Sequence, residues 1–519
     1  MSAKFLYGAA VQGIQSFIFQ TNTLREIVGA SELVAQICED LFRQTVGEDY
    51  KDYDDTAGMG AILHAAGNVK YLFNSREECE KIVRVFPKVV SEYAPGVTVS
   101  QAVVQIDNTD NNSFSKAIDV LEERLKVQRN KPMRSLAIGL MGTLRSRQTN
   151  QPVVKVEKET FYDDATCKKL QIEQEGTSKL CRAAFGTTVK HENFAHDVDK
   201  LTDKNNWIAI IHADGNGLGS VVQKVGKNAR QFSEFSAKLD EATKAAALQA
   251  YHHVKESFQL DQCDTIPIRP IVLSGDDLTV ICRADIAIPY TKVFMEEFER
   301  QTKSKIGNIL TNNDVFSAGG VRDCLTACAG IAYIKTSYPF YYGYELAETL
   351  CSRAKKDAKH SKSIKDGKKL PESCLMFHKV QDSFVEDFDT IAERELRPKD
   401  NISFEFGPYY LADSERTDRK SIDWLIDMTK KLSTGEEKEG NSVKSHLRQW
   451  MSLLHDDEDK ARQKINRLLE ITNMKDYVKD VTSDGRKRMV KKDNQDIEAT
   501  VYPVYDILAI NTINNQVTK

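Results

Sequence analysis

The sequence predicts an α+β fold, with two copies of one βαββαβ unit followed by a mainly helical C-terminal region. Two short apolar runs, at 5–11 and 207–213, each open a similar series of strands and helices. After about residue 380, apolar residues recur at helical spacing. A chain of 519 residues exceeds one ordinary core, so we expect several domains.

The first unit opens with the apolar run FLYGAAV, which is typical of a buried strand. A Gly-Asn turn at Gly67 joins two short apolar runs, which predicts a hairpin. Gly29 lies between two helical patterns, and Ser31 suits a new helix start. The expected elements are a strand at 5–11, helices at 14–27 and 31–46, strands at 60–65 and 69–73, a helix at 75–93 and a strand at 97–106.

The second unit repeats that order from the strand WIAIIHA. Its hairpin turn is Ser274-Gly275-Asp276-Asp277, between two further apolar runs. The expected elements are strands at 207–213, 268–273, 278–282 and 326–334, with helices at 231–258, 288–305 and 342–360. Two such units indicate ferredoxin-like or palm domains.

Four segments follow from this pattern. We expect a first palm, degenerate in its site, at 1–109, a linker or insert at 110–205, a second, catalytic palm at 206–380 and a helical C-terminal domain at 381–519. Residues 474–498 are highly charged with little apolar periodicity, which predicts a mobile loop or arm.

Composition narrows the function classes. The net charge of −4 argues against binding nucleic acid by overall electrostatics, so such binding would need a local patch, for example the basic stretch 124–147, or a partner. That stretch is equally compatible with a solvated linker. The start of the chain does not read as a signal peptide, and no apolar run approaches the ~20 residues that span a bilayer. The 10 scattered cysteines favour a reduced, cytoplasmic protein with no membrane contact.

Two acidic motifs carry the chemistry. The first, Asp214-Gly215-Asn216-Gly217-Leu218-Gly219, ends an apolar strand, and the second is Ser274-Gly275-Asp276-Asp277. In a βαββαβ sheet the first strand lies beside the hairpin, so the two acidic ends can meet. An Asp-Gly turn alone is usually only a turn; the pair at equivalent ends of one unit favours a site.

Hydroxyl attack on an α-phosphate builds negative charge, which two divalent ions can stabilise. We therefore predict Asp214, Asp276 and Asp277 as catalytic ligands of Mg²⁺ or Mn²⁺, since carboxylate oxygens suit hard cations. The glycines allow close approach of the backbone to triphosphate. The predicted nucleotide-binding residues of the motifs are Gly215, Asn216, Gly217, Gly219, Ser274 and Gly275.

The motifs resemble the large polymerase-cyclase subunit of type III CRISPR effector complexes. Residues 214–219 are similar to that family's Asp-Gly-Asp-x-Met-Gly strand end, and 274–277 to its Gly-Gly-Asp-Asp hairpin. The stretches QGIQSFIF at 12–19 and FEFGPYYL at 404–411 resemble parts of its first palm and C-terminal domain. The resemblance covers most of the chain, and it implies that Lys355 and Lys359 on the last helix face triphosphate.

The resemblance implies an enzyme that makes cyclic or short oligonucleotide second messengers from ATP, or from other nucleoside triphosphates, for antiviral defence. Expected partners are nucleoside triphosphates, other CRISPR subunits with guide and target RNA, or a separate effector that the product activates. This chain departs from the family pattern at Asn216, at Ser274 and in having its first palm at the start, without a preceding HD nuclease domain. Gln12 and Asn68 stand in the first palm where a catalytic copy has carboxylates.

Three alternatives stay open. The chain is a non-catalytic structural subunit of a CRISPR ribonucleoprotein that binds nucleotide and RNA, or a standalone relative of the large subunit. A relative of GGDEF diguanylate cyclases is a weaker option, because it leaves two palms unexplained. His212 either touches nucleotide or is an ordinary strand histidine, and the aromatic run 338–344 either stacks on a base or packs the last helix.

Overall fold

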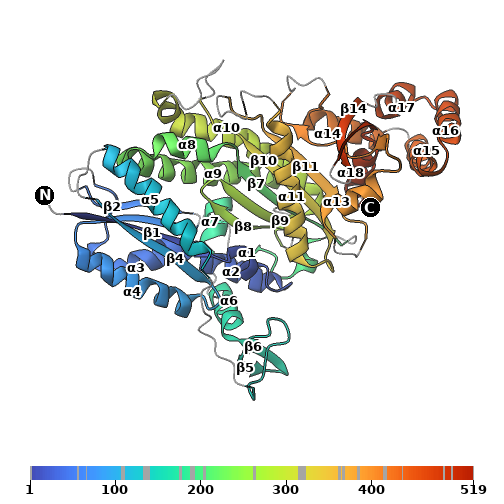
Figure 1. The fold of residues 1–519 in the computed structure, drawn as a ribbon. Coiled ribbons are helices and arrows are strands. Elements are labelled where there is room, and N and C mark those ends of the chain that lie inside the picture. The colour runs from blue at the N-terminus through green and yellow to red at the C-terminus, as the bar shows by residue number, and fades with distance from the viewer. Residues whose placement is uncertain are drawn as a thin grey trace.

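The computed structural model shows two palm domains side by side, with a small hairpin projecting below them and the C-terminal region at the opposite end from the N-terminus (Figure 1). The residues that the structure describes are 3–54, 58–65, 67–106, 111–131, 141–174, 178–186, 193–202, 206–260, 263, 265–313, 323–360, 364, 369–382, 386–412, 418–434, 437–482, 486–492 and 495–517.

The first palm is a four-stranded sheet with the order β2-β3-β1-β4. Strand β1 is antiparallel to both of its neighbours, β3 and β4. Helix α5 packs on β4 and β1. The elements are β1 (Lys4–Gln12), α1 (Ile14–Ile18), α2 (Leu24–Gln36), α3 (Phe42–Val46), β2 (Gly60–Ala65), β3 (Asn68–Phe73), α4 (Arg76–Tyr93), β4 (Thr98–Ile106) and α5 (Asn111–Arg129).

The second palm repeats this arrangement in its core order β8-β9-β7-β10, and β11 and β13 extend the sheet beyond β10. The predicted duplication of a βαββαβ unit is therefore confirmed. The elements are β7 (Trp207–Gly215), α8 (Leu218–Val225), α9 (Ala229–Ser257), β8 (Ile268–Ser274), β9 (Asp277–Arg283), α10 (Ala287–Asn312), β10 (Ala327–Lys335), α11 (Phe340–Ala358), β11 (Cys374–Lys379) and β13 (Tyr409–Tyr410).

The predicted helix break at Gly29 is wrong, because α2 runs through it. A Cβ atom at Gly29 would lie 1.9 Å from the carbonyl oxygen of Lys169. Glycine is required there because the insert helix α6 (Asp164–Gln174) packs directly on the backbone of α2. The sequence shows the glycine but not the helix that crosses it.

The palms contact each other reciprocally. Helix α2 of the first palm packs on β8 of the second, and α9 of the second packs on β2 of the first. Each helix follows the opening strand of its own unit, so the two palms are related by a pseudo-twofold axis. Buried apolar residues of both palms and of the C-terminal region belong to one continuous core.

The insert contributes a hairpin, β5 (Val153–Glu157) with β6 (Thr160–Asp163), together with α6 and α7 (Lys179–Phe185). The C-terminal region is mainly helical, but it also holds a three-stranded sheet in the order β12-β15-β14. Its elements are α13 (Phe388–Ile391), β12 (Ile402–Ser403), α14 (Ile422–Thr434), α15 (Glu437–Asp456), α16 (Glu458–Ile471), α17 (Lys475–Thr482), β14 (Arg486–Lys492), β15 (Gln495–Val501) and α18 (Val504–Val517).

The prediction of a mobile arm at 474–498 is wrong for the described residues, which form α17, β14 and much of β15. The charged composition hides a period of two, in which Val490, Ala499 and Val501 are buried. No helix in the described part of the chain is both long and apolar enough to cross a membrane. All ten cysteines lie among the described residues and are free thiols.

Candidate active site

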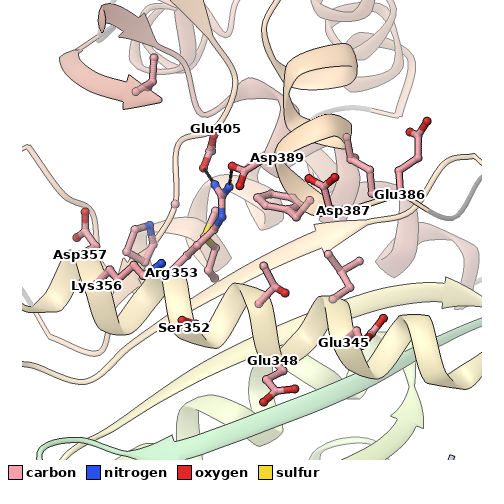
Figure 2. Close-up of a pocket in the computed structure, with 18 of the residues that line it drawn as sticks. Glu345, Glu348, Ser352, Arg353, Lys356, Asp357, Glu386, Asp387, Asp389 and Glu405 are labelled. Carbon is pink, nitrogen blue, oxygen red and sulfur yellow. Dashed lines mark hydrogen bonds and ion pairs between the residues drawn. The ribbon is translucent and has the colours of Figure 1, made fainter. Parts of the chain in front are cut away.

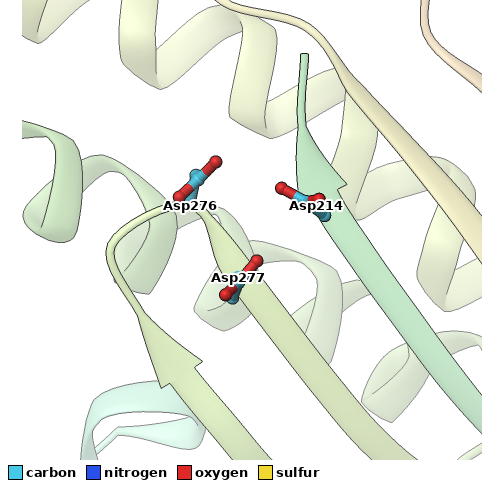
Figure 3. Close-up of side chains that lie close together, drawn as sticks. All are labelled: Asp214, Asp276 and Asp277. Atoms are coloured by element: carbon cyan, nitrogen blue, oxygen red, sulfur yellow. The ribbon is translucent and has the colours of Figure 1, made fainter. Parts of the chain in front are cut away.

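Three carboxylates from the two acidic motifs meet at one edge of the second palm sheet (Figure 3). Asp214 stands near the end of β7, and Asp276 and Asp277 stand at the turn between β8 and β9. One carboxylate oxygen from each lies within 4.8 Å of the others, and it is the only group of potential metal ligands found among the described residues. The predicted convergence is therefore what the structure contains.

The hairpin turn is fixed from outside by α9. Gly275 has φ +65°, a left-handed conformation that favours glycine. Its N–H donates to Asp240 Oδ1 at 3.3 Å, and its carbonyl accepts from the Thr243 hydroxyl at 2.6 Å. Asp240 and Thr243 thus orient the two acidic residues, and nothing in their helical sequence pattern indicates this role.

Gly215 allows Asp276 to approach β7. A Cβ atom on Gly215 would lie 2.8 Å from Asp276 Oδ2 and 2.9 Å from Asp276 Cβ. Any larger residue would therefore push Asp276 away from Asp214. The role of Gly215 in this geometry is to admit a carboxylate.

Lys355 on α11 forms an ion pair with Asp214 and donates to the carbonyl oxygen of Gly215 at 2.9 Å. Burial disfavours the charged ammonium, but the Asp214 carboxylate outweighs burial and raises the pKa of Lys355. This lysine is a cation held at the carboxylates. Lys359, one turn further, is exposed at the C-terminal end of α11.

The carboxylates are poorly neutralised. Burial, with the Asp214 carboxylate, raises the pKa of Asp276 to about 7. Burial and the charges of Asp276 and Asp214 raise the pKa of Asp277 well above its ordinary value. Oxygen ligands grouped this closely, with one lysine as counter-charge, fit a hard divalent cation such as Mg²⁺ or Mn²⁺.

The rest of the first motif forms the start of α8. Gly217 caps this helix with φ +69°, and Gly219 is exposed in the first turn. The N–H groups of this turn are those that a phosphate oxygen can accept from. Asn216 is turned away: its side chain is buried and donates to Thr326 Oγ1 at 3.1 Å and to Cys328 Sγ at 3.3 Å. In this conformation its side chain supports β10.

A cavity of about 660 Å³ lies between the palms beside the carboxylates. The second palm lines it with Ser274, Asp277 and His212, and the first palm with residues of its β1–α1 turn. His212 contacts Thr279 Oγ1 through Nδ1 at 3.2 Å, and burial lowers its pKa to about 4, so it is neutral. His212 is thus both a bonded strand histidine and part of the cavity wall.

Tyr344 joins the palms at this cavity. Its ring stacks on Phe19 of the first palm, with centroids 4.6 Å apart, and its hydroxyl accepts from Gln15 Nε2 at 2.9 Å. The aromatic run 338–344 is therefore divided between two cavities. Tyr341 and Tyr344 line this one, whereas Tyr338 and Tyr342 line another. Arg129, which ends α5 and belongs to the predicted basic stretch 124–147, also lines the cavity. Residues 132–140 of that stretch lie outside the described residues.

The first palm lacks the carboxylates. Its Gly13 caps α1 with φ +72°, matching Gly217 in the second palm. Counting back from these glycines places Ala10 opposite Asp214 and Gln12 opposite Asn216. The pairing of Ala65 with Asn68 corresponds to that of Ser274 with Asp277. The three ligand positions therefore hold Ala10, Gly67 and Asn68 in the first copy.

Comparison with known proteins gives the same fold. Residues 207–364 match the family model described as Cas10/Cmr2, second palm domain. The chain is similar to the crystal structure of a Csm1–Csm4 cassette in complex with pppApApA, with 13% identity, TM-score 0.56 and coverage of 100% of this chain and 70% of that chain. The cassette in complex with cA4 gives 12% identity, TM-score 0.55 and the same coverage.

A Csm1–Csm4 subcomplex of the type III-A CRISPR–Csm interference complex is also similar, with 13% identity, TM-score 0.54, and again 100% and 70% coverage. No curated protein matches the chain. At such low identity the structural likeness establishes the fold. The chain is therefore Cas10-like: its second palm matches the family by sequence, and its whole fold resembles Csm1.

Proposed function

We propose that this protein is a metal-dependent nucleotidyltransferase that joins ATP, or another nucleoside triphosphate, into cyclic or short linear oligonucleotides. Its setting is antiviral defence of the type III CRISPR kind. The observation that carries the proposal is the convergence of Asp214, Asp276 and Asp277 within 4.8 Å at the rim of a cavity between two palms.

The three carboxylates would hold Mg²⁺ or Mn²⁺, which when bound would neutralise the negative charge that develops on the attacking and leaving oxygens. The chain's own groups do the positioning. Lys355 is placed to turn from Asp214 to a phosphate oxygen, and the first turn of α8 offers N–H groups to the triphosphate. Fixed cations and N–H donors of this kind supply most of the rate enhancement in phosphoryl transfer.

The cavity between the palms is suited to the second nucleotide. It opens at Asp277, so a hydroxyl of a nucleotide bound there would lie near the carboxylates. The first palm, with Ala10, Gly67 and Asn68 at the ligand positions, serves as its wall. Arg129 offers a cation for the phosphates of that nucleotide.

The test is mass spectrometry of the products made from the four nucleoside triphosphates with Mg²⁺ or Mn²⁺. Wild-type protein should yield an oligonucleotide and pyrophosphate, and the Asp276→Asn/Asp277→Asn variant should yield neither. Both substitutions keep the side-chain size while removing charge, so folding is preserved. Equal product from the variant would overturn the proposal. So would ATP binding by the wild type that is equally tight with and without the divalent metal.

A non-catalytic assembly role is the second candidate. It is favoured by the similar solved structures, which are Csm1 bound to Csm4 or within a CRISPR–Csm assembly. By analogy this chain would bind a Csm4-like subunit, and through it guide and target RNA. Reconstitution with the neighbouring gene products would separate the candidates: product formation only in the assembly indicates an enzyme with a partner trigger, and its absence there indicates a structural subunit.

A further inference from the structure

A second cavity, of about 1080 Å³, lies between α11 and the C-terminal region (Figure 2). It is on a different side of α11 from the carboxylates: Lys355 contacts Asp214, whereas Arg353 and Asp357 contact the C-terminal region. Figure 2 shows Arg353 reaching from α11 to Glu405 and Asp389 across the cavity. Nothing in the proposed reaction uses this space.

One end of the cavity is built from arginines. Arg353 pairs with Glu405 at 2.5 Å, and Arg397 pairs with the same carboxylate at 3.0 Å. Arg419 forms an ion pair with Asp357. Within the described part of the chain, Arg488 donates to two backbone carbonyls, those of Phe406 and Asp418.

Two buried N–H donors at this end have no hydrogen-bond partner among the residues that the structure describes. They are Arg419 Nη1 and Arg488 Nε, on side chains that are 9% and 6% exposed. The Asp418 Oδ2 atom lies 3.7 and 3.9 Å from them, within ion-pair range but beyond hydrogen-bond length. Leaving buried charged donors unpaired is costly, so natural proteins usually provide an acceptor.

The arginine end of the cavity carries a small excess of positive charge. Five cations line this end, and four carboxylates lie against them. The cations are Arg353, Lys356, Arg397, Arg419 and Arg488, and the carboxylates are those of Asp357, Asp389, Glu405 and Asp418. Glu345, Glu348 and Glu386 lie farther from Arg353, whereas Asp387 lies near Asp389 (Figure 2).

Burial and the neighbouring Arg419 lower the pKa of Arg488 to about 9, which an anion beside it would reverse.

We propose that the arginine end of this cavity is an anion site that takes a phosphate group, as free phosphate or on a nucleotide. Guanidinium groups match phosphate oxygens through planar pairs of N–H donors. Arg419 and Arg488 both line the cavity, and each has one donor, buried just behind its wall, that lacks an acceptor in the described part of the chain. Lys356, exposed at the rim, adds a third cation. The site is separate from the carboxylates and does not depend on the proposed catalysis.

The experiment is a calorimetric titration of the full chain with inorganic phosphate in the presence of EDTA. EDTA removes metal-dependent binding at the carboxylates, and the Asp276→Asn/Asp277→Asn variant should bind phosphate as the wild type does. We expect one site per chain, an affinity loss of about tenfold or more in Arg488→Gln, and a loss of a few fold in Lys356→Ala. Lys431→Ala, a matched change at an exposed lysine elsewhere, should have no effect.

Because Arg488 is buried, the folding of Arg488→Gln is checked by circular dichroism. If Arg488→Gln does not fold, the test depends on Lys356→Ala, whose side chain is exposed. Tighter binding of AMP or pApA than of phosphate would identify a nucleotide as the ligand, and equal binding would identify free phosphate. Absence of saturable binding, or binding unchanged in both Arg488→Gln and Lys356→Ala, would overturn the proposal.

Discussion

Replacing Gly215 by alanine tests whether the spacing of the carboxylates matters. The new Cβ would lie 2.9 Å from Asp276 Cβ, where ordinary contacts are 3.4–4 Å, so the turn must move by roughly 0.5–1 Å. The backbone of Gly215 is not in the left-handed region, so alanine adds no conformational strain. The substitution therefore perturbs one distance, that between Asp276 and Asp214.

A displacement of about 1 Å at a reacting centre costs on the order of 10²-fold in rate. We expect Gly215→Ala to lower the rate of pyrophosphate release by roughly that factor and to weaken Mn²⁺ binding, at a stability cost of about 1–3 kcal/mol. Release is followed by a coupled colorimetric assay, and Mn²⁺ binding by electron paramagnetic resonance, which does not require turnover.

Gly142→Ala is the matched control, because a Cβ there meets no atom within 4 Å. It should leave both readouts unchanged. Wild-type rate and Mn²⁺ affinity in Gly215→Ala would refute the reasoning, since the carboxylate spacing would then be irrelevant or the turn free to adapt. A lower rate with unchanged stability and unchanged Mn²⁺ affinity would refute the metal-site part of it.

Three further changes have defined outcomes. Lys355→Met should lower turnover by about 10²–10³-fold without weakening Mn²⁺ binding, because the ammonium competes with metal for the carboxylate; weaker Mn²⁺ binding would show that it organises the site instead. Thr243→Val removes the hydrogen bond to Gly275, so it should lower the free energy of urea unfolding by about 1 kcal/mol and reduce turnover. A reduced rate with an unchanged free energy of unfolding would contradict the stability part. Asp506, buried and accepting from the Tyr409 hydroxyl at 2.8 Å, has its pKa raised by burial from 3.8 to about 7. Its contribution to the free energy of unfolding is present below pH 3.8 and is lost as pH rises through 7. Between pH 4 and pH 8, the difference in unfolding free energy between Asp506→Asn and wild type should therefore shift in favour of the variant by on the order of 2–4 kcal/mol. The same difference at both pH values would contradict this.

Much of the architecture follows from local patterns. The strands that open both units and the two hairpins were predicted within a residue or two of their observed ends, because apolar runs bounded by Gly-Asn or Gly-Asp turns have few other solutions. The carboxylates were predicted because the order of elements places β7 beside the hairpin. Their meeting is a property of sheet topology, which the repeated pattern already contains.

Other features depend on contacts between distant segments. Gly29 serves close helix packing against Lys169, which no nearby residue reveals. The buried face of β14 is masked by its lysines and arginines. Helix α9 supports Gly275 through Thr243 and Asp240, which lie 32 and 35 positions before it in the chain. In each case the determining neighbour lies elsewhere in the chain, so the local pattern is silent.

The reciprocal packing of α2 on β8 and of α9 on β2 has a consequence for dissecting the molecule. If the chain were cut between the palms, each fragment would expose the apolar face that its counterpart covers, because both belong to one core. Either piece produced by itself should aggregate, whereas both made together in one cell should recombine into a soluble pair. Protein engineers should therefore treat the two repeats as halves of one unit, to be tagged, split or transplanted jointly.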